Sequence, residues 1–188
     1  MTQTSQSKPL RADAQRNAGR ILDAARASFT EFGSDASLEG IAREAGVGIG
    51  TLYRHFPTRD ALVEAVFQQA IDDACAHADE LLESNDPGEA LRLWLRERLR
   101  QSGACRGLAA EAMIMMLDEN GGMRCEPMRA AGAKLLARAQ EAGAARTGTD
   151  IEDLVRLVSA IEMATEDSPD REAQADRLFA LVMDGVRP

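Results

Sequence analysis

Aromatic residues and prolines are scarce in this chain of 188 residues, at 4% and six positions, and almost no segment alternates polar with apolar side chains. Half-buried strands need β-branched and aromatic residues on that two-residue period. Their scarcity excludes a β-protein. Alanine and leucine, which favour helix, occur throughout the chain. We therefore expect an all-α fold of about nine helices, in a chain long enough to bury a sizeable core.

Cysteine is also scarce, with three residues at widely separated positions, Cys75, Cys105 and Cys125. An odd and scattered set does not resemble a disulfide framework. The first twenty residues are polar and lack the apolar core of a signal peptide. No stretch approaches the roughly 18 consecutive apolar residues of a membrane span. We expect a soluble cytoplasmic protein with reduced thiols and no membrane contact.

Motifs of enzymes and metal sites are missing too. The sequence contains no HExxH, no phosphate loop and no pairing of a nucleophile with a base. Asp73, His77 and Glu80 share one helical face at i, i+4 and i+7. They are either metal ligands or a solvated acidic face with one inward histidine. The three cysteines are either sensors or idle thiols, and no CxxC spacing supports sensing. We expect no enzymatic activity, no metal and no cofactor.

Acidic residues are absent where their absence matters most. The net charge is −9, yet residues 1–60 hold eight basic and seven acidic side chains, and the remainder holds 14 basic and 24 acidic ones. Between Ala45 and Arg59 the only charged side chains are Arg54 and Arg59, with His55 beside Arg54. A surface that approaches phosphate cannot carry carboxylates. This segment is therefore a candidate for nucleic-acid binding.

Apolar periodicity and capping signals place the helices. Residues 1–13 show no periodicity and predict a mobile arm that carries Lys8 and Arg11. Ser37, Thr58 and Asp86 are candidate N-caps, and Gly46 is a candidate left-handed C-cap. Thr149 with Glu152 forms a candidate capping box. We expect helices over about 14–33, 38–45, 50–56 and 59–81, and then over 87–102, 106–118, 123–143, 149–166 and 169–186.

The stretch AGVGIGTLYRHF, residues 45–56, predicts a helix-turn-helix. Small Ala42 lets the two short helices approach, Gly46 supplies the turn, and Leu52 fills the angle between the helices. Gly48 and Gly50 then lie at the start of the second helix, where free N–H groups point outward. The alternative is a glycine linker between packed helices. We divide the chain into an arm over 1–13, a DNA-binding domain over 14–60 and a second domain over 61–188.

The segment IAREAGVGIGTLYRHFPTRDAL resembles the DNA-binding signature of TetR/AcrR-type transcriptional regulators, and the resemblance covers about the first third of the chain. It implies phosphate contacts from Ser37, Thr51, Tyr53, His55 and Arg59. It places Ile49, Gly50 and Arg54 nearest the bases. The chain departs from the family at Gly48 and Ile49, where many members have serine and a polar residue. Since Ile49 cannot hydrogen-bond a base edge, specificity rests on Arg54, the arm and DNA shape.

The same resemblance implies a homodimer through the last two helices, about 149–186, and a ligand cavity in the second domain. Glu111 lies in an apolar helix and needs a partner, either Arg98 or a polar group of a ligand. The alternative for the cavity is an ordinary core. The candidate lining residues are His77, Leu91, Trp94, Leu95, Met113, Met116, Leu117 and Leu135.

The function implied is that of a homodimeric repressor that binds a palindromic operator and is released by a small, hydrophobic effector. Two alternatives stay open. One is a small helical enzyme with a DNA-binding appendage, and the other is an architectural DNA-binding protein without a ligand. The sequence leaves undecided the effector, the operator and the choice between repression and activation.

Overall fold

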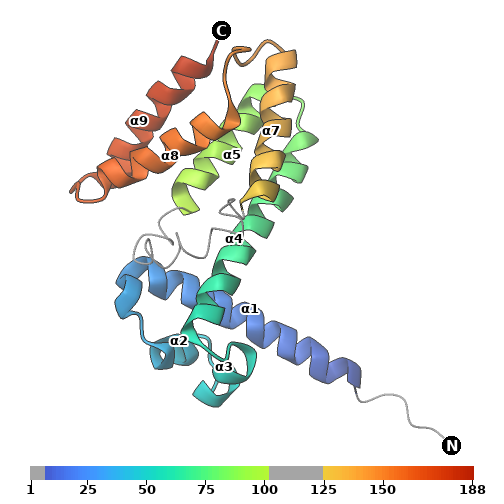
Figure 1. The fold of residues 1–188 in the computed structure, drawn as a ribbon, viewed down its shortest axis with the longest axis vertical. Coiled ribbons are helices and arrows are strands. Elements are labelled where there is room, and N and C mark those ends of the chain that lie inside the picture. The colour runs from blue at the N-terminus through green and yellow to red at the C-terminus, as the bar shows by residue number, and fades with distance from the viewer. Residues whose placement is uncertain (1–6, 102–124) are drawn as a thin grey trace, which may run out of the picture. The chain divides into compact units, whose positions relative to one another are not determined.

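The computed structural model describes residues 7–101 and 125–188, and within these ranges every regular element is helical. The all-α prediction is confirmed, and the helix expected over 106–118 lies outside the described residues. No described helix is long and apolar enough to cross a membrane. The α-helices in Figure 1 are α1 (Ser7–Phe32), α2 (Leu38–Glu44), α3 (Ile49–His55), α4 (Arg59–Leu82), α5 (Pro87–Gln101), α7 (Glu126–Glu141), α8 (Ile151–Thr165) and α9 (Arg171–Val186), with a 3-10 turn η1 at Gly33–Asp35.

The described residues form two compact units. Unit 1 contains α1, η1, α2, α3 and the start of α4 up to Gln68. Unit 2 contains the rest of α4 with α5, α7, α8 and α9. The expected domain boundary at residue 60 therefore falls about two turns of α4 before the boundary between the units.

The first helix begins at Ser7 rather than at the expected Ala14. Pro9 is tolerated in a first helical turn, since the N–H groups there have no helical partner. Leucine, arginine, alanine and glutamine follow it, and all of them favour helix. These residues extend α1 without adding an apolar stripe. The predicted arm is thus wrong for residues 7–13, because periodicity reports burial and not helix formation itself.

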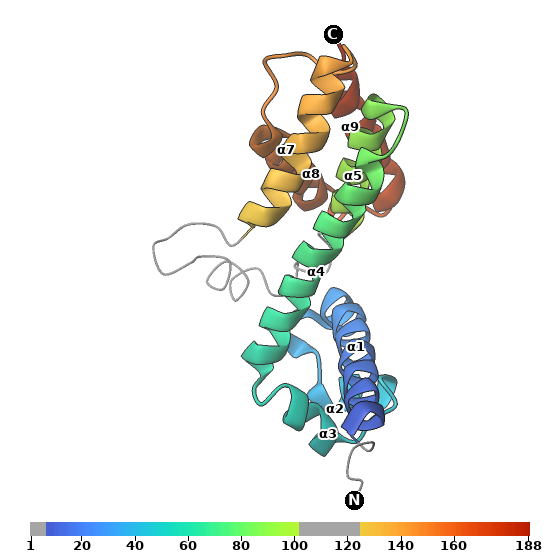
Figure 2. The same ribbon diagram turned by 90° about the vertical axis from the view of Figure 1, so that its right-hand side faces the viewer.

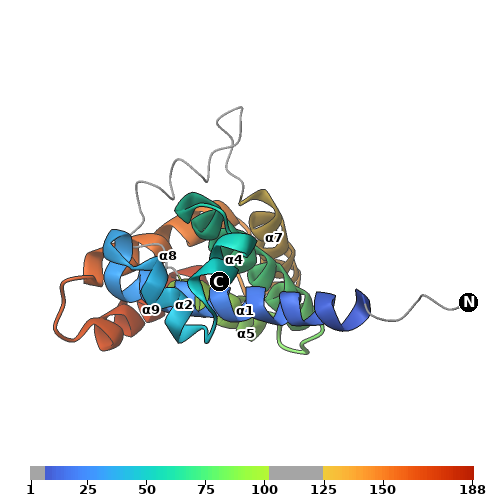
Figure 3. The same ribbon diagram turned by 90° about the horizontal axis from the view of Figure 1, so that it is seen from below.

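The core of unit 1 is built on α1. Ile21 and Phe29 of α1 are fully buried and pack with Ile41 of α2, Leu52 of α3 and Leu62 of α4. Helix α1 packs against both α2 and α3, as Figures 1 and 3 show. Because its buried side chains reach three helices, α1 is the platform that holds the helix-turn-helix.

The core of unit 2 is centred on Trp94 of α5, which is fully buried. Its indole Nε1 donates a hydrogen bond to the carbonyl oxygen of Ala74 in α4, at 3.0 Å. A Cβ at Gly132 of α7 would lie 2.5 Å from the ring, so only glycine fits there. The second half of α4 lies beside α5 and α7 in Figure 2, and Val158 of α8 and Phe179 of α9 complete the core.

Helix α8 begins one residue later than the predicted capping box requires. Its N-cap is Asp150, whose Oδ1 accepts a hydrogen bond from the N–H of Glu152 at 2.7 Å. The backbone carbonyl of Thr149 instead accepts a hydrogen bond from the side chain of Gln140. The capping box expected at Thr149 is therefore wrong. Both residues are good caps, and the neighbouring α7 decides between them.

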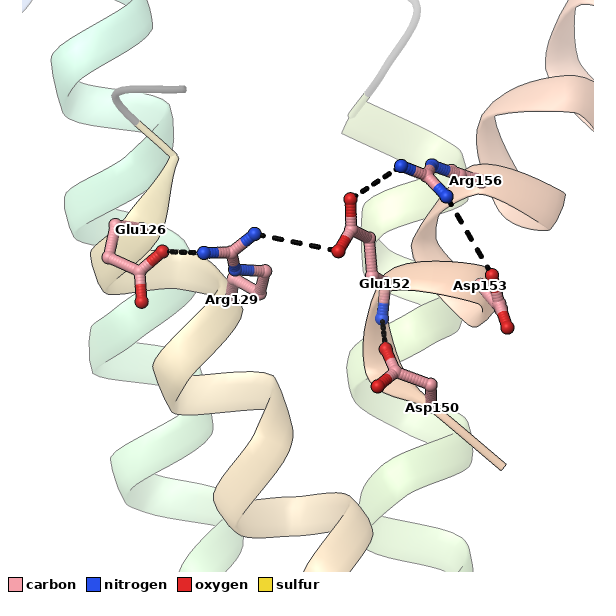
Figure 4. Close-up of polar contacts among 6 residues, drawn as sticks. All are labelled: Glu126, Arg129, Asp150, Glu152, Asp153 and Arg156. Carbon is pink, nitrogen blue, oxygen red and sulfur yellow. Dashed lines mark hydrogen bonds and ion pairs between the residues drawn. The ribbon is translucent and has the colours of Figure 1, made fainter. Parts of the chain in front are cut away.

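An ion-pair network joins the start of α7 to the start of α8 (Figure 4). Arg129 of α7 pairs with Glu126 in its own helix and lies 3.6 Å from the carboxylate of Glu152. Glu152 also accepts a hydrogen bond of 2.6 Å from Arg156, one turn further along α8. These pairs are exposed and contribute little stability, but they help to fix the register of the two helices.

Candidate DNA-binding surface

Helix α3 packs one side against the core of unit 1 and exposes the other side. Leu52 is fully buried, whereas Ile49 and Tyr53 are 37% and 47% exposed. Arg54 is exposed and His55 is half-buried. The side chains expected to contact DNA on this helix are therefore accessible, and Leu52 fixes which face they occupy.

The turn before α3 has the geometry that the sequence predicts. Gly46 has a φ of +66°, in the left-handed region that favours glycine. Its N–H donates a hydrogen bond to the carbonyl of Arg43 at the C-terminal end of α2, which closes with Glu44. The N–H of Val47 donates to the carbonyl of Ala42 at 2.9 Å. This turn sets the angle between α2 and α3, and the prediction for Gly46 is confirmed.

Gly48 and Gly50 are exposed, and neither has a positive φ. A Cβ built at either position would meet no atom within 4 Å. The fold of unit 1 therefore does not need glycine at these positions. Their missing side chains leave room for another molecule to approach the backbone at the start of α3.

Two polar side chains of α3 are organised along its exposed face. Nη2 of Arg54 donates to the hydroxyl oxygen of Thr51 at 3.2 Å, one turn earlier. The ring of His55 lies 6.2 Å from that of Phe56, centre to centre. Arg54 makes no ion pair with any residue in 7–101 or 125–188, so no carboxylate of these ranges neutralises its charge.

Ser37 serves as the N-cap of α2, as predicted. Its hydroxyl oxygen accepts a hydrogen bond of 3.3 Å from the N–H of Gly40 and donates one of 3.1 Å to the carboxylate of Glu39. The hydroxyl proton is thus directed to a neighbouring acid. The phosphate contact expected from Ser37 stays a prediction, and it requires this hydroxyl to leave Glu39.

Arg59 makes contacts within unit 1 that the sequence did not predict. Its Nη1 donates to the carbonyl of Ala36 at 2.7 Å, and its Nη2 donates to the carbonyls of Gly33 at 3.2 Å and Ser34 at 2.9 Å. The guanidinium also lies over the ring of Phe29, 5.2 Å from its centre. These contacts engage the guanidinium within unit 1, and the phosphate contact expected from Arg59 stays a prediction.

In unit 2, the residues expected to line a cavity divide into two groups. Leu91, Trp94, Leu95 and Leu135 are at most 1% exposed and pack in the core. This burial fits the alternative of an ordinary core, and the expectation that they line a cavity stays a prediction. Glu111, Met113, Met116 and Leu117 lie outside the described residues, so the predictions for them are unchanged.

Two polar residues of the predicted cavity are enclosed in unit 2. His77 is half-buried, and its Nδ1 is shielded from solvent without a hydrogen-bond partner among the residues that the structure describes. Arg98 is 9% exposed, and its guanidinium lies over Trp94 at 5.9 Å from the ring centre. Arg98 also donates to the side chain of Gln101 and to the sulfur of Met128. Its contacts include an aromatic face and a thioether.

A cavity of about 310 Å³ lies among α5, α8 and α9, where sequence reasoning did not expect one. Its wall includes Glu162, which is buried on the inner face of α8 and pairs with Arg171 at 3.0 Å. The signal in the sequence is an acid among apolar positions, since Val158, Ile161 and Thr165 are buried on the same face. The spacing of apolar residues alone does not identify a buried acid such as Glu162.

The remaining candidates do not form a site in the described part of the chain. No group of three histidine, cysteine or acidic residues able to hold a metal occurs there. Burial raises the pKa of the Cys75 thiol, as do the charges of Asp72 and Asp79. Burial also raises the pKa of the Cys125 thiol. Both shifts disfavour the reactive thiolate, and Cys105 lies outside the described residues.

Two family models match the chain. One is described as bacterial regulatory proteins of the tetR family and matches residues 21–66, which include the whole helix-turn-helix. The other is described as the C-terminal domain of SbtR-like transcriptional regulators and matches residues 86–188. Together they cover both units.

Solved structures and a curated relative agree with these matches. A TetR transcriptional regulator of Streptomyces coelicolor is 39% identical, with a TM-score of 0.78 over 91% of this chain and 98% of its own. A TetR regulatory protein of Mycobacterium vanbaalenii is 36% identical, with a TM-score of 0.75 over 96% and 100%. An HTH-type transcriptional regulator of Staphylococcus aureus is 38% identical over 73 residues, which are 38% of this chain and 40% of that protein.

Proposed function

This chain belongs to the TetR family of DNA-binding transcriptional regulators, and on that premise we propose that it is a ligand-responsive homodimeric repressor. Each subunit inserts α3 into the major groove of one half of a palindromic operator, and a small hydrophobic effector releases the dimer. The observation that carries the proposal is the exposed, acid-free face of α3, which Leu52 anchors from behind. The protein acts in the cytoplasm and has no catalytic role.

The proposed contacts follow from the accessible side chains of α3. Thr51, Tyr53 and His55 bind phosphates, and the backbone approaches the DNA closely at Gly48 and Gly50. Ile49 and Arg54 lie nearest the base edges, where an arginine donates to guanine and an isoleucine touches a thymine methyl group. Because only one long polar side chain reads bases directly, DNA shape contributes part of the specificity.

We propose that α8 and α9 form the dimer interface. Each helix buries one face in unit 2 and leaves large apolar side chains exposed on the other. Leu157 and Met163 of α8 are 48% and 77% exposed, and Leu181 of α9 is 67% exposed. A second subunit that covers these side chains removes apolar surface from water. Two helix-turn-helix units also supply the paired contacts that one small module lacks.

The effector binds in unit 2 in this proposal. The partly open cavity among α5, α8 and α9 supports this placement; its wall is mostly charged and does not include His77. His77, with its shielded and unpartnered Nδ1, is a candidate donor or acceptor for a polar group of the effector. An effector releases the operator only if it binds the DNA-free conformation more tightly than the DNA-bound one.

Selection of bound duplexes from a random pool by the purified protein tests the proposal. The expected result is a palindromic consensus whose half-sites lie about 34 Å apart, one helical turn of DNA. Failure to retain any duplex at low salt would overturn it. An architectural DNA-binding protein would instead enrich no consensus, and its affinity would not change when candidate hydrophobic ligands are added.

A further inference from the structure

The helix-turn-helix of unit 1 is a segment whose two ends are tied together. The chain enters α2 through the turn at Gly33–Ala36 and leaves α3 just before Arg59. The three carbonyl groups that accept from Arg59 all belong to that entry turn, 23 to 26 residues earlier in the sequence. One guanidinium thus joins the entrance of the helix-turn-helix to its exit.

The entry turn needs such a donor. Carbonyl groups at the end of a helix have no partner within the helix. Gly33 follows the last residue of α1, is buried and has a φ of +54°, and Ala36 is 4% exposed. Arg59 supplies charged donors to both of their carbonyl groups. Without Arg59, the carbonyl of Ala36 loses this donor and the carbonyl of Gly33 keeps only the N–H of Ala36, at 3.2 Å, so the turn has a reason to rearrange.

Helix α3 depends on this bracing because it is short. It has seven residues, its N-cap Gly48 makes no side-chain capping bond, and Leu52 is its only buried residue. A helix of two turns is marginal by itself. The direction of its exposed side chains is therefore set by how its ends are held. Arg59 is the first residue of α4, four residues after α3 ends at His55, and the ring of buried Phe29 on α1 supports the guanidinium.

We propose that Arg59 is a positioning residue for DNA binding: it fixes how α3 is presented to the groove and does not itself contact a phosphate. This inference rests on the proposed DNA-binding role of α3. It reverses the expectation that the resemblance attaches to this position. A lysine keeps the charge but cannot reach three carbonyl groups and an aromatic face together, since only guanidinium is a planar fork of five donors.

The test compares Arg59→Lys with Arg59→Gln by measuring operator affinity as a function of salt. We expect both variants to lose about tenfold in affinity, because both break the same set of charged hydrogen bonds. The lysine variant keeps the wild-type slope of log affinity against log salt. A lost phosphate contact would lower that slope by about 0.9 for each contact. Arg43→Lys is the matched control, since it makes the same change at an exposed position of α2.

Amide hydrogen exchange without DNA gives a second readout. In both Arg59 variants, the amides at the start of α2 and the end of α3 exchange faster than in the wild type, whereas those of α5 and α8 do not change. Arg43→Lys leaves exchange and affinity unchanged. All measurements are made well below the melting temperature of the least stable variant, so that every sample is folded.

Two results would overturn the inference. If Arg59→Lys binds like the wild type and only Arg59→Gln is weakened, with a lower salt slope, Arg59 is a phosphate contact. If both variants bind like the wild type but melt earlier, its role is stability alone. If the wild-type protein binds no duplex, that result contradicts the proposed function instead. The hydrogen-exchange measurement then still decides whether the hydrogen bonds of Arg59 order α3.

Discussion

The two units use the same residue types in opposite ways. Several arginines of unit 2 face carboxylates: Arg92 pairs with Glu89, and Arg171 pairs with buried Glu162. In unit 1, Arg54 donates to a hydroxyl group and Arg59 to backbone carbonyls, and neither pairs with a carboxylate of the described residues, whereas Arg16 of α1 pairs with Asp13. An arginine that already holds a carboxylate is a poor phosphate ligand, because the carboxylate must first be displaced. The guanidinium of Arg54 on α3, in unit 1, therefore remains available to bind DNA.

Glycine shows the same contrast. Gly132 of unit 2 is required by packing, since a Cβ there would collide with Trp94. Gly48 and Gly50 of unit 1 have open space around them. The glycine of unit 2 is needed for the packing of its own core, whereas the two glycines of unit 1 leave room for a partner molecule. If this contrast holds, substitutions in unit 2 should change stability, and those on α3 should change binding.

Trp94→Ala should have the largest effect on stability. It removes a fully buried side chain and the hydrogen bond from Nε1 to Ala74. We expect the free energy of unfolding to fall by about 3–5 kcal/mol, measured by chemical denaturation and far-UV circular dichroism. Leu93→Ala, at the next position of α5, is the control and should cost less than about 1 kcal/mol because this side chain is 38% exposed. Similar losses in both variants would contradict the central place given to Trp94.

Gly132→Ala should also destabilise the protein, although alanine is the better helix former. The added Cβ would lie 2.5 Å from the Trp94 ring and 3.1 Å from Ile151. Overpacking of this kind costs about 1–3 kcal/mol. The matched variant is Gly50→Ala, for which we expect unchanged or slightly higher stability together with weaker operator binding. If Gly50→Ala leaves binding intact, the open space at that position does not serve DNA.

Local signals in the sequence were sufficient to predict the helix-turn-helix. The caps at Ser37 and Thr58, together with the turn at Gly46, involve atoms three or four residues apart, and all three are confirmed. The partners of Arg59 and Trp94 could not be predicted, for a common reason. Their partners lie at least twenty residues away, at Ala36 and Ala74. The spacing of apolar residues along a helix shows that a side chain is buried, but it does not show which group that side chain contacts.

The polar residues of unit 2 show the same limit. His77 was selected as an inward histidine on α4, and the structure encloses its Nδ1. Glu162 was not selected, because one acid on an apolar face does not change the period of that face. Its partner Arg171 belongs to the next helix. A cavity lined by three helices can therefore be found only from the packed structure, whereas a recognition helix can be predicted because its residues form one continuous segment.

On α3, two substitutions should separate affinity from specificity. Tyr53→Ala removes an exposed phenol and should weaken binding to all duplexes about equally, by roughly tenfold. Arg54→Ala should instead change the preference among duplexes, by about 1–3 kcal/mol at one base pair of each half-site. Both variants should keep the wild-type melting temperature, because both side chains are exposed. Equal loss on every duplex for Arg54→Ala would count against base reading by this residue.

The smallest expected effect belongs to an ion pair of unit 2. The side-chain hydrogen bond from Arg92 lowers the pKa of Glu89, so the native state favours the ionised carboxylate. This stabilisation is fully present above the unfolded pKa of glutamate and is lost as pH falls through the folded pKa. Since both side chains are more than a third exposed, Glu89→Gln should cost no more than about 0.5 kcal/mol at pH 7. The difference from the wild type should vanish in acid, when the carboxyl is protonated in both states, and Glu83→Gln, at an exposed position, is the control for the substitution itself. A difference that grows as the pH falls would mean that Arg92 does not stabilise the carboxylate, and the contrast between arginines of the two units would lose one of its examples.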